Sequence, residues 1–204
     1  MKFSINLRIA LLAIGIVVSI TAADTPLNGL KVAILVTDGF EKSEFNEPKK
    51  ALDDAGAKTS VISDKKNTVK AWHNNNWSSS INVDVQLNSA SPKDYDALLL
   101  PGGVINPDKL RIIPAAIQFI KEFLKDKKPI AAICHSPWTL INAQGVKGHT
   151  LTSWPSLQVD LENAGAKWVD EPVVTDKLLV TSRKPEDIPE YNQAMIKLFA
   201  ASKK

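Results

Sequence analysis

The chain has 204 residues, of which 44% are hydrophobic and 23% are charged, and its formal net charge is +3. These proportions are those of a globular protein, so they exclude a disordered chain, and the length suits a single domain. The one cysteine excludes an internal disulfide, and the lack of an arginine cluster or a basic stripe with interleaved aromatic residues argues against nucleic-acid binding.

The first 23 residues have the layout of an export signal. A short basic start precedes an apolar run over residues 9–20, and Thr21-Ala22-Ala23 supplies the small residues that a signal peptidase reads. The run is shorter than the about 20 residues of an ordinary membrane span. We therefore predict cleavage after Ala23, a domain over 24–204 without a membrane anchor, and a periplasmic or secreted location. An uncleaved N-terminal anchor is the alternative.

Strand and helix signals alternate along the rest of the chain. Apolar, β-branched runs predict buried strands over 31–37, 57–63, 94–100, 129–133 and 178–182. Helical spacing and turn residues predict helices over about 43–55, 111–126, 137–145, 156–164 and 187–202. Shorter extended pieces are expected near 68–72, 81–86, 149–153 and 167–175, the first two as a hairpin. This order predicts an α/β fold with a mostly parallel sheet and helices on both faces.

Unusual residues follow three of the predicted strands. These segments are Asp38-Gly39-Phe40-Glu41, Pro101-Gly102-Gly103 and Cys134-His135-Ser136-Pro137. Because ligands of open parallel sheets bind beyond the carboxyl ends of the strands, we expect the three segments to converge on one cleft.

Cys134 lies between a buried strand and the start of a helix, which favours a thiolate and projects the side chain as in a nucleophile elbow. A buried core cysteine is the alternative. His135 is the candidate general base, although consecutive residues of a regular helix do not face each other; a capping or packing histidine is the alternative. No two histidines have the spacing of metal ligands and only one cysteine is present, so we expect no metal site.

A carboxyl group beside the thiol would complete such a site. A protonated Glu41 would donate a hydrogen bond to a thiolate, whereas an ionised Glu41 would repel it, so the site should raise the carboxyl pKa. The alternative is an ordinary acidic residue of the first helical turn, a role that Glu44 fits better. The amides of Gly103 and His135 are candidates for an oxyanion hole, unless the glycine pair forms only a turn.

Four segments of the chain resemble the PfpI family of the class I glutamine-amidotransferase-like superfamily. They are KVAILVTDGFEKSEF, YDALLLPGG, PIAAICHSPWTLINA and VVTDKLLVTSRKPEDIPEYN. The resemblance implies a flavodoxin-like sandwich, homo-oligomers and no cofactor. It also implies Cys134 as nucleophile, Glu41 as the carboxyl that touches its thiol, His135 as its base and Gly103 in the oxyanion hole. Asp108 matches the acidic residue by which a neighbouring subunit orients the histidine.

One residue departs from this family, because Ser136 stands where the family usually has glycine. A serine would be strained there if the position required a positive φ. Family activities include peptidase, cofactor-independent glyoxalase and deglycase, and other members are described as stress-protective chaperones.

We therefore expect a cysteine-dependent enzyme that acts on a small-molecule carbonyl or a peptide substrate. A redox sensor or chaperone of the cell envelope, in which Cys134 is oxidised without turnover, is the alternative. A scaffold that has lost its site is supported only by Ser136.

Overall fold

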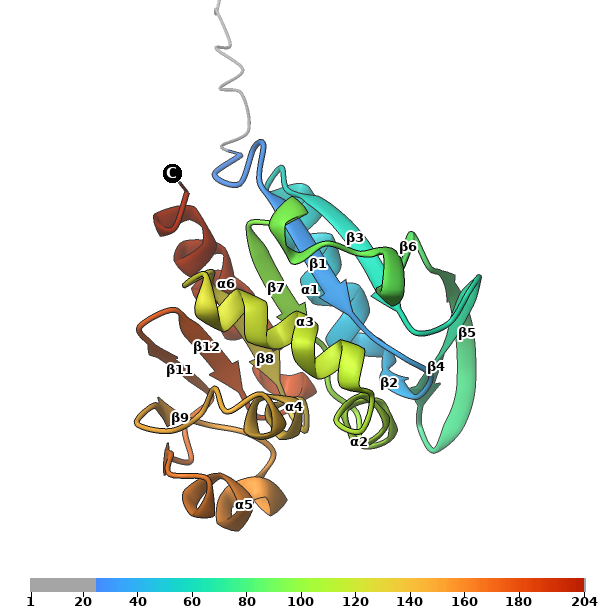
Figure 1. Ribbon diagram of the computed structural model, residues 1–204. Helices are drawn as coiled ribbons and strands as arrows, with labels where there is room; N and C mark the ends of the chain where they lie inside the picture. The colour runs from blue at the N-terminus through green and yellow to red at the C-terminus, as the bar shows by residue number, and fades with distance from the viewer. Residues whose placement is uncertain (1–24, 204) are drawn as a thin grey trace, which may run out of the picture.

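The computed structural model describes residues 25–203, and its centre is a seven-stranded sheet (Figure 1). The strand order is β11-β12-β8-β7-β1-β3-β6, and every neighbouring pair is parallel except β11 with β12. The strands are β1 (Lys31–Leu35), β3 (Lys58–Ser63), β6 (Val85–Gln86), β7 (Ala97–Leu100), β8 (Ile130–Ile133), β11 (Val173–Asp176) and β12 (Leu179–Ser182). The predicted mostly parallel α/β sheet is confirmed.

Two small sheets lie beside the central one. The first contains β2 (Phe40–Glu41), β4 (Thr68–His73) and β5 (Asn76–Asn82). A hairpin is confirmed, but its second strand is β5 and not the predicted piece near 81–86, whose end is β6 of the central sheet. The second small sheet pairs β9 (Thr150–Leu151) with β10 (Lys167–Trp168). Asn74 and Asn75 have φ values of 48° and 59°, a backbone region that asparagine tolerates better than most residues, which explains the tight turn.

Helices cover both faces of the central sheet (Figure 1). They are α1 (Lys42–Asp54), α2 (Ile105–Leu110), α3 (Pro114–Lys125), α4 (Pro137–Asn142), α5 (Gln158–Asn163) and α6 (Ile188–Ala201). Side chains of β1 alternate between two cores: Val32 and Ile34 join the core under α1 and α6, whereas Ala33 and Leu35 join the core under α3. A strand buried on both faces therefore reads as a continuous apolar run.

The predicted helix over 111–126 is wrong at its beginning. The chain forms α2 first, turns through residues 111–113, and starts α3 at Pro114. Ile113 is extended, with φ −93° and ψ 108°, because a proline ring disfavours the helical region for the residue before it. Pro114 then occupies the first helical position, where its missing N–H is not needed.

The predicted export signal over 1–23 lies outside the described residues. Within residues 25–203, no helix combines the length and the hydropathy that a bilayer crossing requires.

Candidate functional site

The three segments that follow β1, β7 and β8 meet at the carboxyl end of the sheet. A Cβ atom added to Gly102 would lie 2.6 Å from the carbonyl oxygen of Ile133 and 2.7 Å from Cβ of Cys134, and it would also contact the Glu44 carboxyl group. A Cβ atom on Gly103 would lie 2.7 Å from the amide nitrogen of Glu41. The two glycines thus let the backbone of one segment approach the other two within contact distance.

Cys134 occupies a sharp turn between β8 and α4. Its φ is +64°, an uncommon value for a residue other than glycine, and it carries a strain of about 1 kcal/mol. Two backbone hydrogen bonds hold the turn: the Cys134 amide donates to Ser182 (3.0 Å), and the Trp154 amide donates to the Cys134 carbonyl (3.0 Å). The geometry is that of the predicted nucleophile elbow.

Ser136 is not strained, contrary to the concern raised by its sequence. Its φ is −59° and its ψ is −26°, values that any residue adopts, because the positive φ falls on Cys134 instead. The Ser136 hydroxyl is buried and donates to the carbonyl of Ile133 at 2.8 Å. The residue therefore supports the turn and gives no sign of a lost site.

The imidazole of His135 faces the thiol of the preceding residue. Nδ1 of His135 is 3.1 Å from Sγ of Cys134, a contact that the sharp turn permits and a regular helix would not. The ring packs against two tryptophans, with centroid distances of 5.2 Å to Trp138 and 5.8 Å to Trp154, and it stacks on the second with an angle of 22° between the planes. Burial lowers the pKa of His135 to about 4, so the ring is neutral at pH 7. With its proton on Nε2, the ring could accept the thiol proton at Nδ1.

The carboxyl group at the thiol belongs to Glu44, so the prediction that Glu41 touches Cys134 is wrong. Glu44 is fully buried, its Oε2 accepts the Gly103 N–H (3.1 Å), and its carboxyl group shares a hydrogen bond with the Cys134 thiol. The Glu41 carboxyl group instead lies 3.0 Å from Nδ1 of His73.

The start of α1 explains this exchange of roles. Glu41 is the extended residue before the helix, whereas Glu44 shares the buried face of α1 with Phe45, Pro48 and Leu52. Glu44 is therefore not an ordinary, solvent-exposed acidic residue of the first helical turn either, because its side chain points into the core.

Burial governs the protonation of the pair. It raises the pKa of Glu44 to about 8; the hydrogen bond with Cys134 opposes this rise and the nearby charge of Glu41 adds to it. Burial also raises the pKa of the Cys134 thiol, as would a negative charge on Glu44. Glu44 therefore holds its proton at pH 7. A neutral carboxyl group does not repel a thiolate, and its O–H can donate to the sulfur. The thiol is also neutral at rest, contrary to the thiolate expected from the sequence, so a thiolate forms only when the thiol proton is transferred.

The predicted oxyanion-hole amides and Asp108 have different surroundings from those expected. The Gly103 N–H donates to Oε2 of Glu44 (3.1 Å), so it is not free for a substrate oxygen. The His135 N–H hydrogen-bonds the Cys134 sulfur, which partly offsets the rise of the thiol pKa. Asp108 is exposed on α2, and within the described chain its carboxyl group forms no hydrogen bond or ion pair. Its contact with the histidine of a neighbouring subunit stays a prediction.

Asn106 is a site residue that the sequence reasoning missed. It is fully buried; its Oδ1 accepts the Thr37 N–H (2.8 Å), and its Nδ2 donates to the carbonyls of Pro101 (2.8 Å) and Gly102 (3.3 Å). One amide side chain thus joins the ends of β1 and β7. The available signal was an asparagine between two apolar residues, Ile105 and Pro107, three positions after the Gly-Gly turn.

Replacing Gly102 with alanine is expected to disrupt the site. The added methyl group would overlap the Glu44 carboxyl group and two groups of the β8 end, and overpacking of this kind costs about 1–3 kcal/mol. We expect a lower unfolding midpoint in chemical denaturation and faster alkylation of Cys134. The matched control is Gly148→Ala, because no heavy atom lies within 4 Å of its added Cβ, although its φ of 74° gives it some strain of its own. Equal alkylation rates for wild type and Gly102→Ala would contradict the packing described here.

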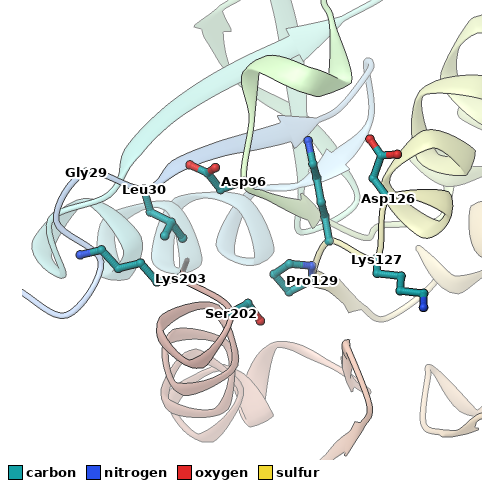
Figure 2. A pocket seen from close by; sticks show the side chains of 9 residues that line it. Gly29, Leu30, Asp96, Asp126, Lys127, Pro129, Ser202 and Lys203 are labelled. Carbon is teal, nitrogen blue, oxygen red and sulfur yellow. The ribbon is translucent and has the colours of Figure 1, made fainter.

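A separate cavity lies at the other end of the sheet (Figure 2). Its volume is about 330 Å³, and its lining includes Leu30, Asp96 and Pro129, which directly precede β1, β7 and β8. Two of its polar side chains are engaged by the backbone, since Asp96 accepts the Lys31 N–H (2.8 Å) and Lys128 donates to two backbone carbonyls. Within residues 25–203, no cluster of three or more His, Cys, Asp or Glu side chains could hold a metal ion.

Comparisons with known proteins agree with the predicted resemblance. The model of the DJ-1/PfpI family matches residues 30–198. General stress protein 18 of Bacillus subtilis is 45% identical over 173 residues, which cover 84% of this chain and 98% of that protein. An uncharacterized protein of Staphylococcus aureus is 44% identical over 170 residues, 82% of this chain and 96% of that protein.

Solved structures agree with the fold. DJ-1beta of Drosophila melanogaster has a TM-score of 0.76 and 27% identity, and the match covers 84% of this chain and 90% of that one. A two-domain protein of Anabaena variabilis, with a DJ-1/ThiJ/PfpI-like and a ferritin-like domain, has a TM-score of 0.77 and 32% identity. That match covers 82% of this chain and 47% of the other, so this chain spans about half of the two-domain protein.

Proposed function

Because the chain belongs to the DJ-1/PfpI family and packs a buried thiol against a carboxyl group and an imidazole, we propose that it is a stress-protective enzyme in which Cys134 attacks reactive carbonyl compounds. The observation that carries the proposal is the 3.1 Å contact between Sγ of Cys134 and Nδ1 of His135. It supplies a nucleophile and a proton acceptor within hydrogen-bond reach.

The chemistry proceeds in balanced steps. The thiol proton passes to Nδ1 of His135, Sγ bonds to the aldehyde carbon, and the π electrons of the C=O bond move to oxygen. The imidazolium returns its proton to that oxygen and leaves a hemithioacetal. A low pKa makes protonated His135 a ready donor for this step. With an α-ketoaldehyde, a further proton shift between the two carbonyl carbons gives a thioester, which water cleaves to a hydroxy acid and the free thiol.

Two features favour a small carbonyl compound over a peptide. Cys134 is only 6% exposed and His135 only 7%, which leaves little room for a polypeptide backbone. Amide hydrolysis also depends on donors for the oxyanion, whereas the Gly103 N–H is engaged by Glu44. Peptidase activity is therefore the second candidate.

The test is a panel of methylglyoxal, a methylglyoxal-modified amine and unstructured peptides, with Cys134→Ala as the control. Consumption of the ketoaldehyde without cleavage of the peptides supports the proposal. Peptide cleavage alone would support the peptidase. If wild type turns over none of these substrates but suppresses aggregation of a client protein, the enzyme proposal is replaced by the chaperone or redox-sensor hypothesis.

We also propose that the chain is exported and forms homo-oligomers. Export rests on the basic, apolar and small-residue layout of residues 1–23. The oligomer rests on the exposed position of Asp108, which a second copy could approach. N-terminal sequencing of the protein from its host and sedimentation of the purified chain test the two statements separately.

A further inference from the structure

Lys127 and Lys128 line a second cavity in addition to the one in Figure 2. The volume of this second cavity is about 240 Å³. Its walls come from the loop after α3, the segment after α4 and the turn between β11 and β12, and they include the first residues of β8 and β12. The cavity therefore lies at the opposite end of β8 from Cys134, and what it binds does not depend on the proposed function.

An apolar wall forms one part of this cavity. It consists of leucine and isoleucine side chains, namely Leu124, Ile130, Leu178 and Leu179. Ile130 and Leu179 belong to the buried core under α3, and Leu124 packs against that core. The Lys128 ammonium group donates to two backbone carbonyls at 2.7 and 2.8 Å, so this lysine offers its methylene stem to the cavity. The hydrophobic core thus extends to the surface at this point.

The other side chains of the cavity are basic. They are Lys127, His149 and Lys177, and no acidic side chain accompanies them among the described residues that line the cavity. The Lys127 side chain points away from the carboxyl group of its neighbour Asp126 (Figure 2). The Lys177 ammonium group lies 3.4 Å from the carbonyl oxygen of Gly148, which is long for a hydrogen bond. Within the described part of the chain, both lysines therefore keep ammonium donors for an anion.

Asp176 is the acidic group behind His149, and its charge is already engaged. One of its carboxyl oxygens accepts the Thr150 N–H at 2.8 Å and lies 3.3 Å from Nδ1 of His149. The carboxylate thus faces these two groups and forms no ion pair with its neighbour Lys177 within residues 25–203. An anion bound beside the lysines would meet little repulsion from it.

The backbone at both lysines is unusual for this residue type. The φ values are 52° at Lys127 and 57° at Lys177, in the left-handed region that glycine and asparagine adopt more readily. Such conformations gather at ligand sites, where the side chain is needed in spite of the strain. Two lysines of this kind at one cavity indicate that their charge is used there.

We propose that this cavity binds a small monocarboxylic acid, with its chain or ring against the apolar wall and its carboxylate between Lys127 and Lys177. A cavity of about 150 Å³ holds benzene and drug-sized ligands need about 300 Å³ or more, so a volume of about 240 Å³ suits an acid of about six to ten carbon atoms. A neutral hydrocarbon would leave the ammonium groups unused, and inorganic phosphate would leave the apolar wall in water. A dicarboxylic acid would place its second charge against that wall.

The test is a titration of the full, isotope-labelled chain that is followed by its backbone amide NMR signals. The probes are octanoate, 1-octanol, which keeps the chain without the charge, and acetate, which keeps the charge without the chain. We expect octanoate to shift the amide signals of Gly145, His149 and Leu178 with a dissociation constant on the order of 0.1–1 mM, as its small size allows. The other two probes should bind at least about tenfold more weakly, because each lacks one half of the recognition.

Three variants separate the charges from the apolar wall. Lys127→Gln/Lys177→Gln should weaken octanoate binding about tenfold, because it removes both partners of the carboxylate. The matched control is Lys121→Gln/Lys197→Gln, which removes the same charge from exposed positions of α3 and α6 outside the cavity and should keep the affinity within about twofold of wild type. Leu178→Trp places a larger side chain in the cavity and should abolish the shifts.

No shift of these amide signals with about 10 mM octanoate would overturn the inference. Binding of 1-octanol as tight as that of octanoate, or an equal loss of affinity in the control double variant, would also overturn it, because the two lysines would then not hold the carboxylate. Undiminished binding in Leu178→Trp would place the ligand elsewhere. Thermal unfolding shows that each variant is folded, and if Leu178→Trp is not, the two lysine double variants decide the outcome.

Discussion

The stability of the Glu44→Gln variant is expected to depend far less on pH than that of wild type between about pH 4.5 and pH 8. In the folded protein burial raises the pKa of Glu44 from 4.5 to about 8, so the folded state binds this proton more tightly than the unfolded chain does. A raised pKa contributes stability that is complete below the unfolded value and is lost as the pH rises through the folded value. The free energy of unfolding of wild type should therefore fall by on the order of 5 kcal/mol across this range. The Glu44→Gln variant should show none of this fall, because its side chain does not titrate.

The measurement is the free energy of unfolding by denaturant at several pH values in both proteins. His135 has a lowered pKa and so contributes the opposite slope below its ordinary value of 6.5, but it does so in both proteins and cancels in the difference. Glu41→Gln is the matched control, since it removes a carboxyl group three residues away that lies against His73, and most of the wild-type slope should remain. Parallel curves for wild type and Glu44→Gln would contradict the buried, protonated carboxyl group.

Cys134→Ala is expected to reduce turnover of the ketoaldehyde by at least about a thousandfold. The reaction forms a bond to Sγ, and no other side chain offers a nucleophile at that position, so the loss falls on kcat. The variant should stay folded, because alanine removes only one buried atom. Steady-state kinetics with methylglyoxal give the ratio, and a denaturation curve gives the stability.

Ser136→Gly is the matched control for this experiment. Ser136 follows the Cys134-His135 pair and supports the turn through Ile133, and its ordinary backbone conformation accepts glycine. We expect its turnover to stay within several-fold of wild type. Turnover by Cys134→Ala at the wild-type rate would remove Cys134 from the chemistry altogether.

Most of the fold follows from patterns that the sequence displays openly. Strands buried on both faces read as apolar runs, and β1, β8 and β12 lie within the predicted ranges for that reason. The error at residues 111–126 arose because the apolar spacing runs on through a turn. Pro114 was the signal of a boundary, since the residue before a proline is disfavoured in a helix.

The sequence predicts where the site lies but not all of the contacts within it. The location follows from the strand ends, which the alternation of strand and helix signals identifies, and Cys134 and His135 are in contact there. The choice of Glu41 over Glu44 came from the family resemblance and not from an error in the helix, since α1 begins at Lys42, within one residue of the predicted start. What decides between the two glutamates is the direction of the Glu44 side chain, which lies on the buried face of α1.

Long-range polar contacts account for what the sequence could not supply. Asn106 joins two strand ends, and the Gly103 amide is engaged by a side chain 59 positions earlier in the chain. No periodic pattern marks such pairings, because they depend on how close the folded segments come. The buried face of α1 was the one usable signal, since Glu44 follows the spacing of Phe45, Pro48 and Leu52.

The titration of Glu44 itself tests the account most directly. Carbon-13 NMR of the glutamate side-chain carboxyl groups, with the Glu44 resonance assigned by its loss in Glu44→Gln, follows that group from pH 3 to pH 10. We predict a midpoint near 8, and a change of that midpoint when Cys134 is replaced by alanine. A Glu44 midpoint near 4.5 that does not respond to Cys134→Ala would show that the carboxyl group and the thiol are not coupled, and the proposed chemistry would lose its basis.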